Sequence, residues 1–468
     1  MDRQPPSKRF FDRVGNYFKQ LTGHELGDYF DDKNLKSVVP ALAQDRATAK
    51  SVSRTLCAAA SGSASACTKP LDSKKKAPPP RPLQLQPPKA AAQTSPPAAA
   101  PAAAVSDPPR VLIGVERNSA AELTQKPVYW QPAQQTNGFA LVVGGSGSGK
   151  TELLKALAAE TSRQAVPVIV LDFHGDLELP GISNYQASRG GVAINPLELS
   201  SRDPVSGGPE TQTEALLDAV RRAAPGFGRV QELALREVVR ESYQAAGITE
   251  DQRTWNKPPP SLAQVQARLM AASKDPKRRS EQRSLLGIAA AVSVAFSDPV
   301  FRGGNALSIR NLLVSGGRVA MGSLSRAAKV LAVDTILRQV LGALRSQGLV
   351  TPGRKYRVLV VLDEASLVNG AAILDEIFKE ARKFGLALVL ASQEAGDFSA
   401  SVRANAATLY ALRTNSAQQA QALAKELSLS PTLLLNLQGP GDGFVKDRFG
   451  TRRLQVLSLT SEQRAKLR

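Results

Sequence analysis

From residue 110 onward, short continuous apolar runs alternate with longer stretches whose apolar residues recur at helical spacing. A continuous apolar run is typical of a strand buried on both faces, and an intervening helix returns the chain to the same edge of a parallel sheet. The clearest runs are residues 139–143, 166–172, 318–322, 356–364 and 386–391. The clearest helical stripe is formed by Val330, Val333, Leu337, Leu341 and Leu344. We therefore predict an α/β fold with a mainly parallel sheet.

Weaker patterns extend this core on both sides. VLIGVE and KPVYWQP, between residues 110 and 138, predict two short strands that form a small β preface. Towards the other end, the pattern predicts a strand at 408–413, a helix at 417–427 and a strand pair at 443–459. Residues 139–468 are thus assigned to one α/β domain that follows the preface.

Residues 201–284 interrupt this alternation with a helical pattern. Leu235, Val239 and Tyr243 share one helical face, and Leu262, Val265 and Leu269 share another, so we predict an all-α insertion within the α/β domain. A basic cluster closes the insertion: Lys274, Lys277, Arg278, Arg279 and Arg283. Such a cluster could contact DNA phosphates, although a solvated face is the more common reason for a run of charges.

The first 109 residues have a different composition. Residues 1–40 contain a short amphipathic segment, Arg9–Leu21, with Phe10, Val14 and Phe18 on one face. Residues 41–109 consist largely of Ala, Ser, Pro and Lys, which cannot bury a core, so we predict a disordered linker. The amphipathic segment could dock a partner or touch a membrane, but packing on its own protein is favoured, and membrane association is not.

Composition narrows the class of partner. The 468 residues carry a formal net charge of +19 with a pI near 10.0, which favours a polyanionic partner such as nucleic acid. Two cysteines and two histidines cannot build a zinc site, and they suit a reducing cytoplasm. No apolar run is long enough to span a bilayer, and the start of the sequence has no secretory pattern, so we expect a cytoplasmic protein.

The first chemical motif follows the apolar run at 139–143 and fits the P-loop pattern G-x-x-x-x-G-K-[ST]. Glycines allow the backbone to bend until successive N–H groups point at phosphate oxygens, and the following helix adds the positive end of its dipole. Lys150 is expected to reach the β and γ phosphates, and the Thr151 hydroxyl to hold Mg²⁺. We therefore predict that ATP with Mg²⁺ is bound by Gly144, Gly145, Ser146, Gly147, Ser148, Gly149, Lys150 and Thr151.

The second motif is an apolar strand, YRVLVVLDE, that ends in two acids. Asp363 is placed to hold Mg²⁺ together with Thr151. Glu364 is placed to polarise the attacking water, which favours hydrolysis of ATP over phosphoryl transfer to a small molecule. The sequence therefore predicts an ATPase rather than a kinase.

Further polar residues follow the later strands. Gln393 ends the run at 386–391 and could touch the γ phosphate, although an ordinary surface residue is the alternative. Arg382, Arg403 and Arg413 lie near the ends of late elements, and in a ring one of them could act as an arginine finger in a neighbouring subunit. A structural role remains open for each of these arginines.

Taken in order, these parts resemble a known family. GGSGSGKT, LDFHGD, the helical insertion, VVLDEA and RKFGLALVLASQ are similar to motifs of the HerA/FtsK superfamily of ring-shaped DNA-pumping ATPases, which includes ATPases of conjugation and type IV secretion. The resemblance covers residues from about Arg110 to the C-terminus. It implies a RecA-like P-loop fold, with Asp363 and Glu364 in the metal and water roles and Gln393 as the sensor.

The resemblance also implies a homo-oligomeric ring, expected to be a hexamer, that moves along double-stranded DNA. Two alternatives remain open at this stage. One is a conjugation or type IV secretion ATPase at a membrane channel. The other is a nucleotide-dependent scaffold that assembles a partner such as a nuclease in a DNA-processing or phage-defence complex. Glu364 argues against the scaffold, because a scaffold has little need of a carboxylate that activates water.

Overall fold

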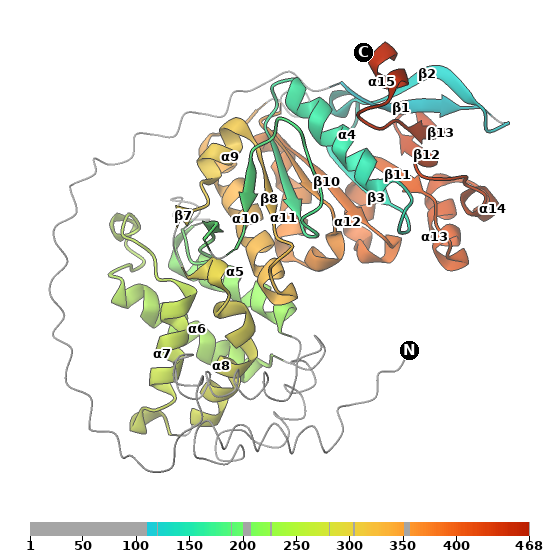
Figure 1. The fold of residues 1–468 in the computed structure, drawn as a ribbon. Coiled ribbons are helices and arrows are strands. Elements are labelled where there is room, and N and C mark those ends of the chain that lie inside the picture. Colours follow the sequence, from blue (N-terminus) through green and yellow to red (C-terminus); the bar gives the residue numbers. More distant parts are fainter. Residues whose placement is uncertain are drawn as a thin grey trace, which may run out of the picture. The chain divides into compact units, whose positions relative to one another are not determined.

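The computed structural model describes residues 110–467, apart from 119, 189, 200–206, 225–226, 280, 303–304 and 351–355. The predicted amphipathic segment and linker therefore lie outside the described residues. The chain forms two compact units. The larger contains the sheet (Figure 1), and the smaller includes, among the described residues, 227–235, 266–279 and 281–293.

An eleven-stranded sheet forms the larger unit (Figure 1). Its parallel part runs, in spatial order, through β11 (Thr408–Leu412), β3 (Phe139–Val143), β10 (Leu386–Ser392), β9 (Val358–Leu362), β4 (Val168–Asp172), β8 (Gly317–Ala320) and β5 (Asn184–Gln186). Four strands with antiparallel pairing continue beyond β11: β12 (Asp442–Asp447), β13 (Gly450–Val456), β1 (Val111–Arg117) and β2 (Leu123–Trp130). The predicted mainly parallel α/β sheet is confirmed.

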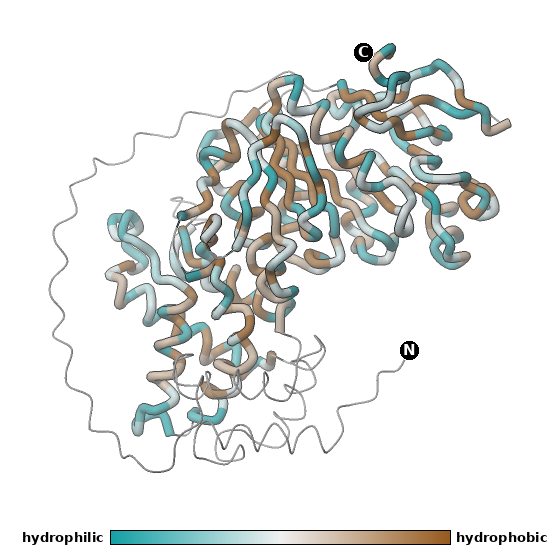
Figure 2. Tube along the Cα trace, viewed as in Figure 1, coloured by the Kyte–Doolittle hydropathy of each residue, from teal (hydrophilic) through white to brown (hydrophobic). Residues whose placement is uncertain are grey.

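Both faces of the parallel strands are buried, which explains their continuous apolar sequences (Figure 2). Ala140 and Val142 join a core cluster with Leu153 and Leu157 of α4 (Lys150–Arg163). On the other face, Phe139 contacts Phe378 of α11 (Ala372–Glu380) edge to face, with ring centroids 4.8 Å apart. The long helix predicted from the 330–344 stripe is α10 (Arg326–Ser346), and its stripe is buried.

The insertion consists of α5 (Gly208–Ala223), α6 (Arg229–Ala245), α7 (Leu262–Ala272) and α8 (Gln282–Phe296). The residues that predicted two helical faces, from Leu235 to Tyr243 and from Leu262 to Leu269, are buried along α6 and α7. The helical pattern runs past residue 284, since α8 continues to Phe296. In the larger unit, α5 is tied to α10 through the buried Asp334, which accepts hydrogen bonds from Arg222 (2.5 Å) and Arg338 (2.6 Å).

The two preface strands are part of the main sheet rather than a body of their own. Strand β1 pairs with β13, with Gly114 opposite Val456, and thereby joins residues far apart in the sequence. The short helix α15 (Glu462–Leu467), which the sequence pattern did not predict, closes this edge with a fully buried arginine. The Arg464 guanidinium donates hydrogen bonds to the carbonyls of Leu112 (2.7 Å) and Ile113 (2.9 Å) and to Glu160 Oε1 (3.1 Å).

Smaller elements were also not predicted. They are α9 (Ile309–Ser315), α12 (Ala400–Asn405), α14 (Pro431–Leu435) and β7 (Asn305–Ala306), which pairs with β6 (Val192–Ala193) in a two-stranded sheet. The predicted helix at 417–427 is present as α13 (Ala417–Leu427). Helix α11 ends at Glu380, and the chain continues as a 3₁₀ turn, Ala381–Phe384.

Candidate nucleotide-binding site

The carboxyl ends of four adjacent parallel strands bring the predicted site residues together. Ser392 of β10 lies opposite Val143 of β3, and Leu390 lies opposite Leu362 of β9. Leu362 in turn pairs with Leu171 of β4. The glycine loop follows β3, and Gln393 follows β10. The acidic pair, Asp363 and Glu364, follows β9, and β4 ends at Asp172. One edge of the sheet therefore collects both motifs, as expected for a ligand site in an open α/β sheet.

The glycine loop has the backbone conformation that its sequence predicts. Gly147 and Gly149 have φ values of +69° and +95°, a backbone conformation that residues with a Cβ atom rarely adopt. Gly149 is also the N-cap of α4, so the first amides of that helix face the loop. A Cβ on Gly149 would lie 2.5 Å from the Gly441 nitrogen. Glycine is required there for two reasons, backbone angle and space.

Three separate segments hold the loop from outside. The amide of Gly144 donates to the Ser392 carbonyl (3.3 Å), and the amide of Gly145 donates to the Arg413 carbonyl (2.9 Å). The Ser148 carbonyl accepts from the amide of Gly441 (2.8 Å), in the QGPG turn before β12. The loop conformation is thus set by contacts with residues that lie up to about 300 positions later in the sequence.

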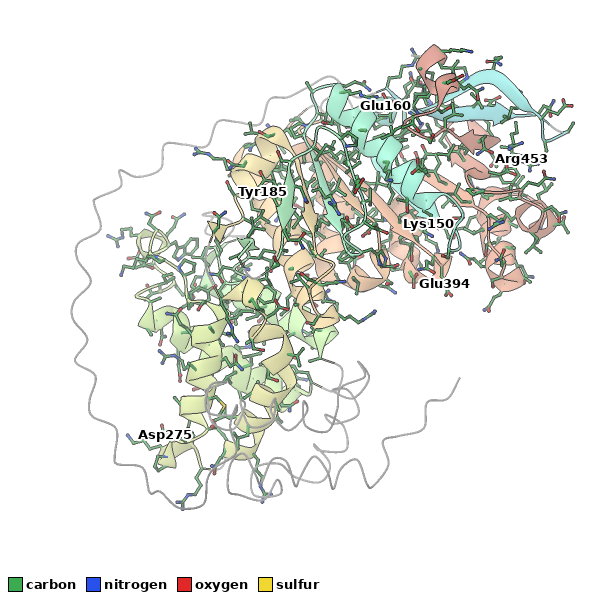
Figure 3. The ribbon with its side chains drawn as sticks, in the orientation of Figure 1. Lys150, Glu160, Tyr185, Asp275, Glu394 and Arg453 are labelled. Carbon is green, nitrogen blue, oxygen red and sulfur yellow. The ribbon has the colours of Figure 1, made fainter. Side chains whose placement is uncertain are left out.

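Lys150 begins α4 and is half-buried (Figure 3). Its Nζ donates to the loop carbonyls of Gly144 (2.6 Å) and Gly145 (3.0 Å). Burial lowers the pKa of Lys150, while the nearby Glu364 carboxylate opposes this shift. Thr151 is exposed at the start of the helix, and Ser146 is exposed in the loop, whereas the Ser148 hydroxyl is buried without a hydrogen-bond partner.

The two acids after β9 occupy different environments. Asp363 Oδ1 accepts from the amide of Phe173 (3.0 Å). Burial raises the pKa of Asp363 to about 8, and the neighbouring Asp172 and Glu364 carboxylates also raise it. Glu364 Oε1 lies 3.5 Å from the Ser392 hydroxyl and 3.3 Å from the amide of Ser366. A bound cation would favour the ionised form of Asp363. Glu364 is a second carboxylate, and it lies near Lys150.

Asp172 is a site residue whose role the sequence did not reveal. Carboxylate oxygens of Asp172, Asp176 and Asp363 lie within 4.8 Å of one another. Burial would raise the pKa of Asp172, but hydrogen bonds from the amides of Leu177 and Gly175 and from Arg318 outweigh it and lower the pKa. These donors hold the Asp172 carboxylate in place beside Asp363. Its position at a strand end was the available signal.

Gln393 leaves β10 beside the glycine loop, and its side chain is exposed. Its carbonyl accepts from Gln419 Nε2, and Gln419 Oε1 accepts from the Thr414 hydroxyl (2.8 Å). The preceding Ser392 is buried and donates its hydroxyl proton to Asp397. The backbone of the predicted sensor is therefore fixed, and its sensor role stays a prediction.

The three candidate fingers occupy different places. Arg413 follows β11 and contacts its own glycine loop through its carbonyl. Arg382 is exposed in the turn before β10, at the opposite edge of the sheet. Arg403 pairs with Glu426 (3.0 Å) and donates to the Ala395 carbonyl (3.1 Å), so a structural role explains it. The finger assignment to Arg382 or Arg413 stays a prediction.

The residues fit a nucleotide with Mg²⁺. The unpaired buried hydroxyl of Ser148, the positive-φ glycines and the start of a helix form a cradle for phosphates. Oxygen ligands from Thr151 and Asp363 are of the kind that Mg²⁺ prefers. Among the described residues, no helix is both long and apolar enough to cross a membrane.

Comparisons with known proteins agree with this geometry. Residues 138–297 match the family model of the helicase HerA central domain, and no curated protein matches the sequence. VirB4 of Thermoanaerobacter pseudethanolicus is similar in structure, with a TM-score of 0.61 and 19% identity over 75% of this chain and 98% of that one.

The bacterial conjugative coupling protein TrwBdeltaN70 is also similar, with a TM-score of 0.52 and 16% identity over 76% of this chain and 97% of that one. The same values hold for TrwB in complex with ADP and Mg²⁺. At these identities the similarity is one of fold, and it confirms the RecA-like P-loop architecture. Residues 138–297 are thus similar to the HerA central domain, and the described chain shares the RecA-like P-loop fold of VirB4 and TrwB.

Proposed function

We propose that this protein hydrolyses ATP with Mg²⁺ and uses the cycle to move double-stranded DNA. The observation that carries the first part is the meeting of the glycine loop and the two acids at one edge of the sheet, where Ser392 accepts from the amide of Gly144 and its hydroxyl lies 3.5 Å from Glu364. A second carboxylate beside the metal ligand supplies a base for water, which a phosphate-binding fold without hydrolysis does not need.

Each residue has a separable task in this proposal. The amides of residues 144–151 and the Lys150 ammonium bind and orient the phosphates. Bound Mg²⁺ would neutralise charge on the β and γ phosphates, and Thr151 and Asp363 would hold it. Glu364 accepts a proton from the attacking water, and the amide of Ser366, which donates to Glu364 Oε1 (3.3 Å), orients that carboxylate. Gln393 is placed to sense the γ phosphate.

The choice of DNA as the polymer that is moved rests on charge. The net charge of +19 favours a polyanion, and the exposed lysines and arginines of the 274–283 segment offer phosphate contacts that do not read bases. The family resemblance implies a ring, and an arginine finger must come from outside the cradle that it serves. We therefore propose a homo-oligomeric ring, a hexamer, in which Arg382 or Arg413 reaches a neighbouring site.

The test is ATP turnover of the full chain with and without duplex DNA, together with the mass of the oligomer. We expect stimulation by duplex DNA, a hexameric mass and displacement of a third strand from a triplex, which reports movement. Lys150→Ala should abolish turnover and displacement. Turnover that ignores DNA, with no triplex displacement, would contradict the DNA part and leave the ATPase intact.

A second candidate is an ATPase of a conjugation or type IV secretion machine. The fold similarity to TrwB, a conjugative coupling protein, favours it. The amphipathic segment Arg9–Leu21 would then serve as the docking piece at a membrane channel. Flotation with anionic liposomes distinguishes the two candidate functions. The full chain is compared with the double variant Phe10→Ser, Phe18→Ser. Flotation that depends on these two aromatics supports the second candidate.

A further inference from the structure

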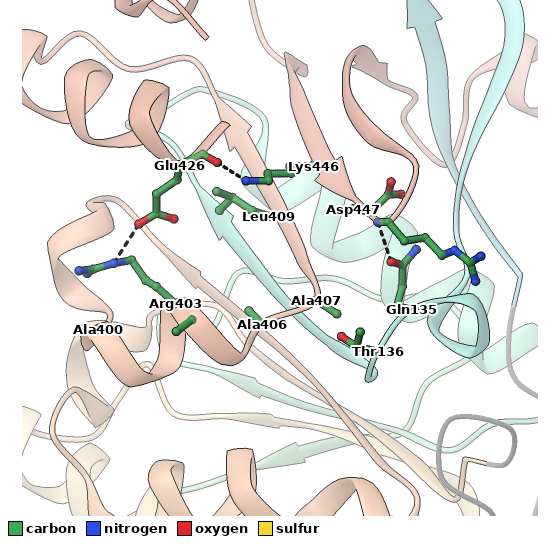
Figure 4. A pocket seen from close by; sticks show the side chains of 12 residues that line it. Gln135, Thr136, Ala400, Arg403, Ala406, Ala407, Leu409, Glu426, Lys446 and Asp447 are labelled. Carbon is green, nitrogen blue, oxygen red and sulfur yellow. Dashed lines mark hydrogen bonds and ion pairs between the residues drawn. The ribbon is translucent and has the colours of Figure 1, made fainter. Parts of the chain in front are cut away.

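A pocket of about 600 Å³ opens at the edge of the parallel sheet opposite the glycine loop (Figure 4). Its walls come from segments that precede the strands: Gln135 and Thr136 before β3, and Ala406 and Ala407 before β11. Helices α12 and α13 and the end of β12 complete it. Strands β3 and β11, which run between the two sites, are five residues long, so the sites lie about 17 Å apart. This pocket is therefore not part of the candidate nucleotide site.

The pocket carries surplus positive charge. Its two acids are neutralised, because Glu426 pairs with Arg403 (3.0 Å) and Asp447 pairs with Arg452 (2.6 Å). The remaining cations donate only to backbone carbonyls: Lys446 to that of Glu426, and Arg448 to that of Gln134 (2.7 Å). Within the described part of the chain, neither Lys446 nor Arg448 forms an ion pair.

An exposed aromatic ring lies beside Arg448. Phe449 occupies the tight turn between β12 and β13, where Asp447 pairs with Gly450, and 48% of its surface is exposed. The guanidinium carbons of Arg448 and Arg452 lie 5.3 and 5.6 Å from the ring centroid. A hairpin turn needs no phenylalanine, and turn positions usually hold small polar residues, so packing does not explain this side chain.

We propose that this pocket and the Phe449 ring bind single-stranded nucleic acid. Lys446 and Arg448 would contact phosphates, and Phe449 would stack with a base, with Arg448 adding a cation–π contribution. An exposed ring favours a single strand because the base faces of a duplex are covered by stacking, whereas unpaired bases present them. The exposed Thr136 hydroxyl offers a polar contact on the same wall. This inference goes beyond the proposed movement of duplex DNA and does not depend on ATP hydrolysis.

The test measures binding of the full chain to a labelled thymidine strand of about 20 nucleotides and to a duplex of the same length, by fluorescence anisotropy. We expect Phe449→Ala to weaken strand binding about tenfold while duplex affinity and basal ATP turnover stay unchanged. Phe449→Trp should retain strand affinity, because the stacking surface is kept. Leu349→Ala, at an exposed apolar residue away from the pocket, is the matched control and should change nothing.

Arg448→Gln tests the contribution of charge separately from that of the ring. It should weaken binding of the thymidine strand and make that binding less sensitive to salt. Unchanged strand affinity in Phe449→Ala would overturn the proposal. So would an equal loss for strand and duplex, which would indicate phosphate contacts alone. An altered oligomer mass with intact strand affinity would show instead that another copy of the chain covers this surface.

Discussion

Adjacent carboxylates at the end of β9 differ because their surroundings differ. Asp363 is largely enclosed, accepts from the amide of Phe173 and has a raised pKa, which suits a ligand that is ionised by a cation. Glu364 is half-buried and lies near a hydroxyl, Ser392, and an ammonium, Lys150. These different surroundings support the separate tasks proposed for the two acids, so we expect that exchange of one for the other would not be conservative.

We predict that Glu364→Gln binds ATP normally and hydrolyses it about 10²- to 10⁴-fold more slowly, because the amide keeps the shape but cannot accept the proton of water. Single-turnover hydrolysis and equilibrium nucleotide binding measure the two effects. Glu394→Gln is the matched control, since Glu394 is exposed in the loop that follows β10. Equal turnover in Glu364→Gln and wild type would remove Glu364 from the mechanism.

At the scale of elements, the glycine loop depends on the turn before β12. Gly441 donates to the Ser148 carbonyl, and the Gly441 backbone occupies the space beside Gly149. The turn is itself fixed by Asp442, a fully buried carboxylate that Arg453 contacts at 2.7 Å. The antiparallel end of the sheet thus supports the glycine loop, the proposed phosphate site.

Two glycines of one loop should respond differently to alanine. Gly147→Ala meets only the backbone strain of a positive φ, about 1 kcal/mol, because its surroundings are open. Gly149→Ala adds a contact of 2.5 Å with the Gly441 backbone, which cannot move aside. We expect Gly149→Ala to lose most nucleotide affinity and Gly147→Ala to lose little, as measured by titration of a fluorescent ATP analogue. The reverse order would contradict the packing described here.

The C-terminal helix α15 is a structural clamp at the element scale. Arg464 satisfies backbone carbonyls of β1 and the carboxylate of Glu160 on α4, the helix that begins at the glycine loop. Arg464→Met keeps the approximate length of the side chain but removes the buried hydrogen bonds of the guanidinium to the Leu112 and Ile113 carbonyls and to Glu160, so we expect a loss of about 3 kcal/mol in unfolding free energy. Chemical denaturation measures it. Lys466→Met, exposed on the same helix, should be neutral.

For the whole molecule, the positive charge is the property that bears most on binding to DNA. The exposed basic residues Lys274, Lys277 and Arg279 of the helical unit contribute to a net charge of +19. If they contact phosphates, each contact releases counterions and adds about 0.9 to the dependence of log affinity on log salt.

We predict that the triple variant Lys274→Gln, Lys277→Gln, Arg279→Gln lowers this salt slope for duplex DNA by about 2 to 3. Nitrocellulose filter binding over a salt series is the measurement. The control removes the same charge elsewhere, by Lys126→Gln, Lys379→Gln and Lys466→Gln, all at exposed residues. If both variants change the slope equally, binding depends on total charge and not on the 274–283 segment.

Most elements could be predicted because their signals are local. Strands buried on both faces have continuous apolar sequences, and α10 has a helical stripe, so both can be recognised without the fold. Short elements such as β5 and α15 have too few residues for a period to emerge. The helical pattern continues past residue 284, because α8 runs to Phe296 and is apolar around most of its circumference.

The sequence by itself determined the fold class and the chemical motifs, because a P-loop, a strand that ends in two acids and their order along the chain are local patterns. Only the tertiary structure decided what surrounds them. It placed Asp172 beside Asp363, Gly441 behind Gly149 and Phe449 beside an electropositive pocket. These relations join residues separated by tens to hundreds of positions, and such contacts depend on strand order and register, which no local pattern specifies.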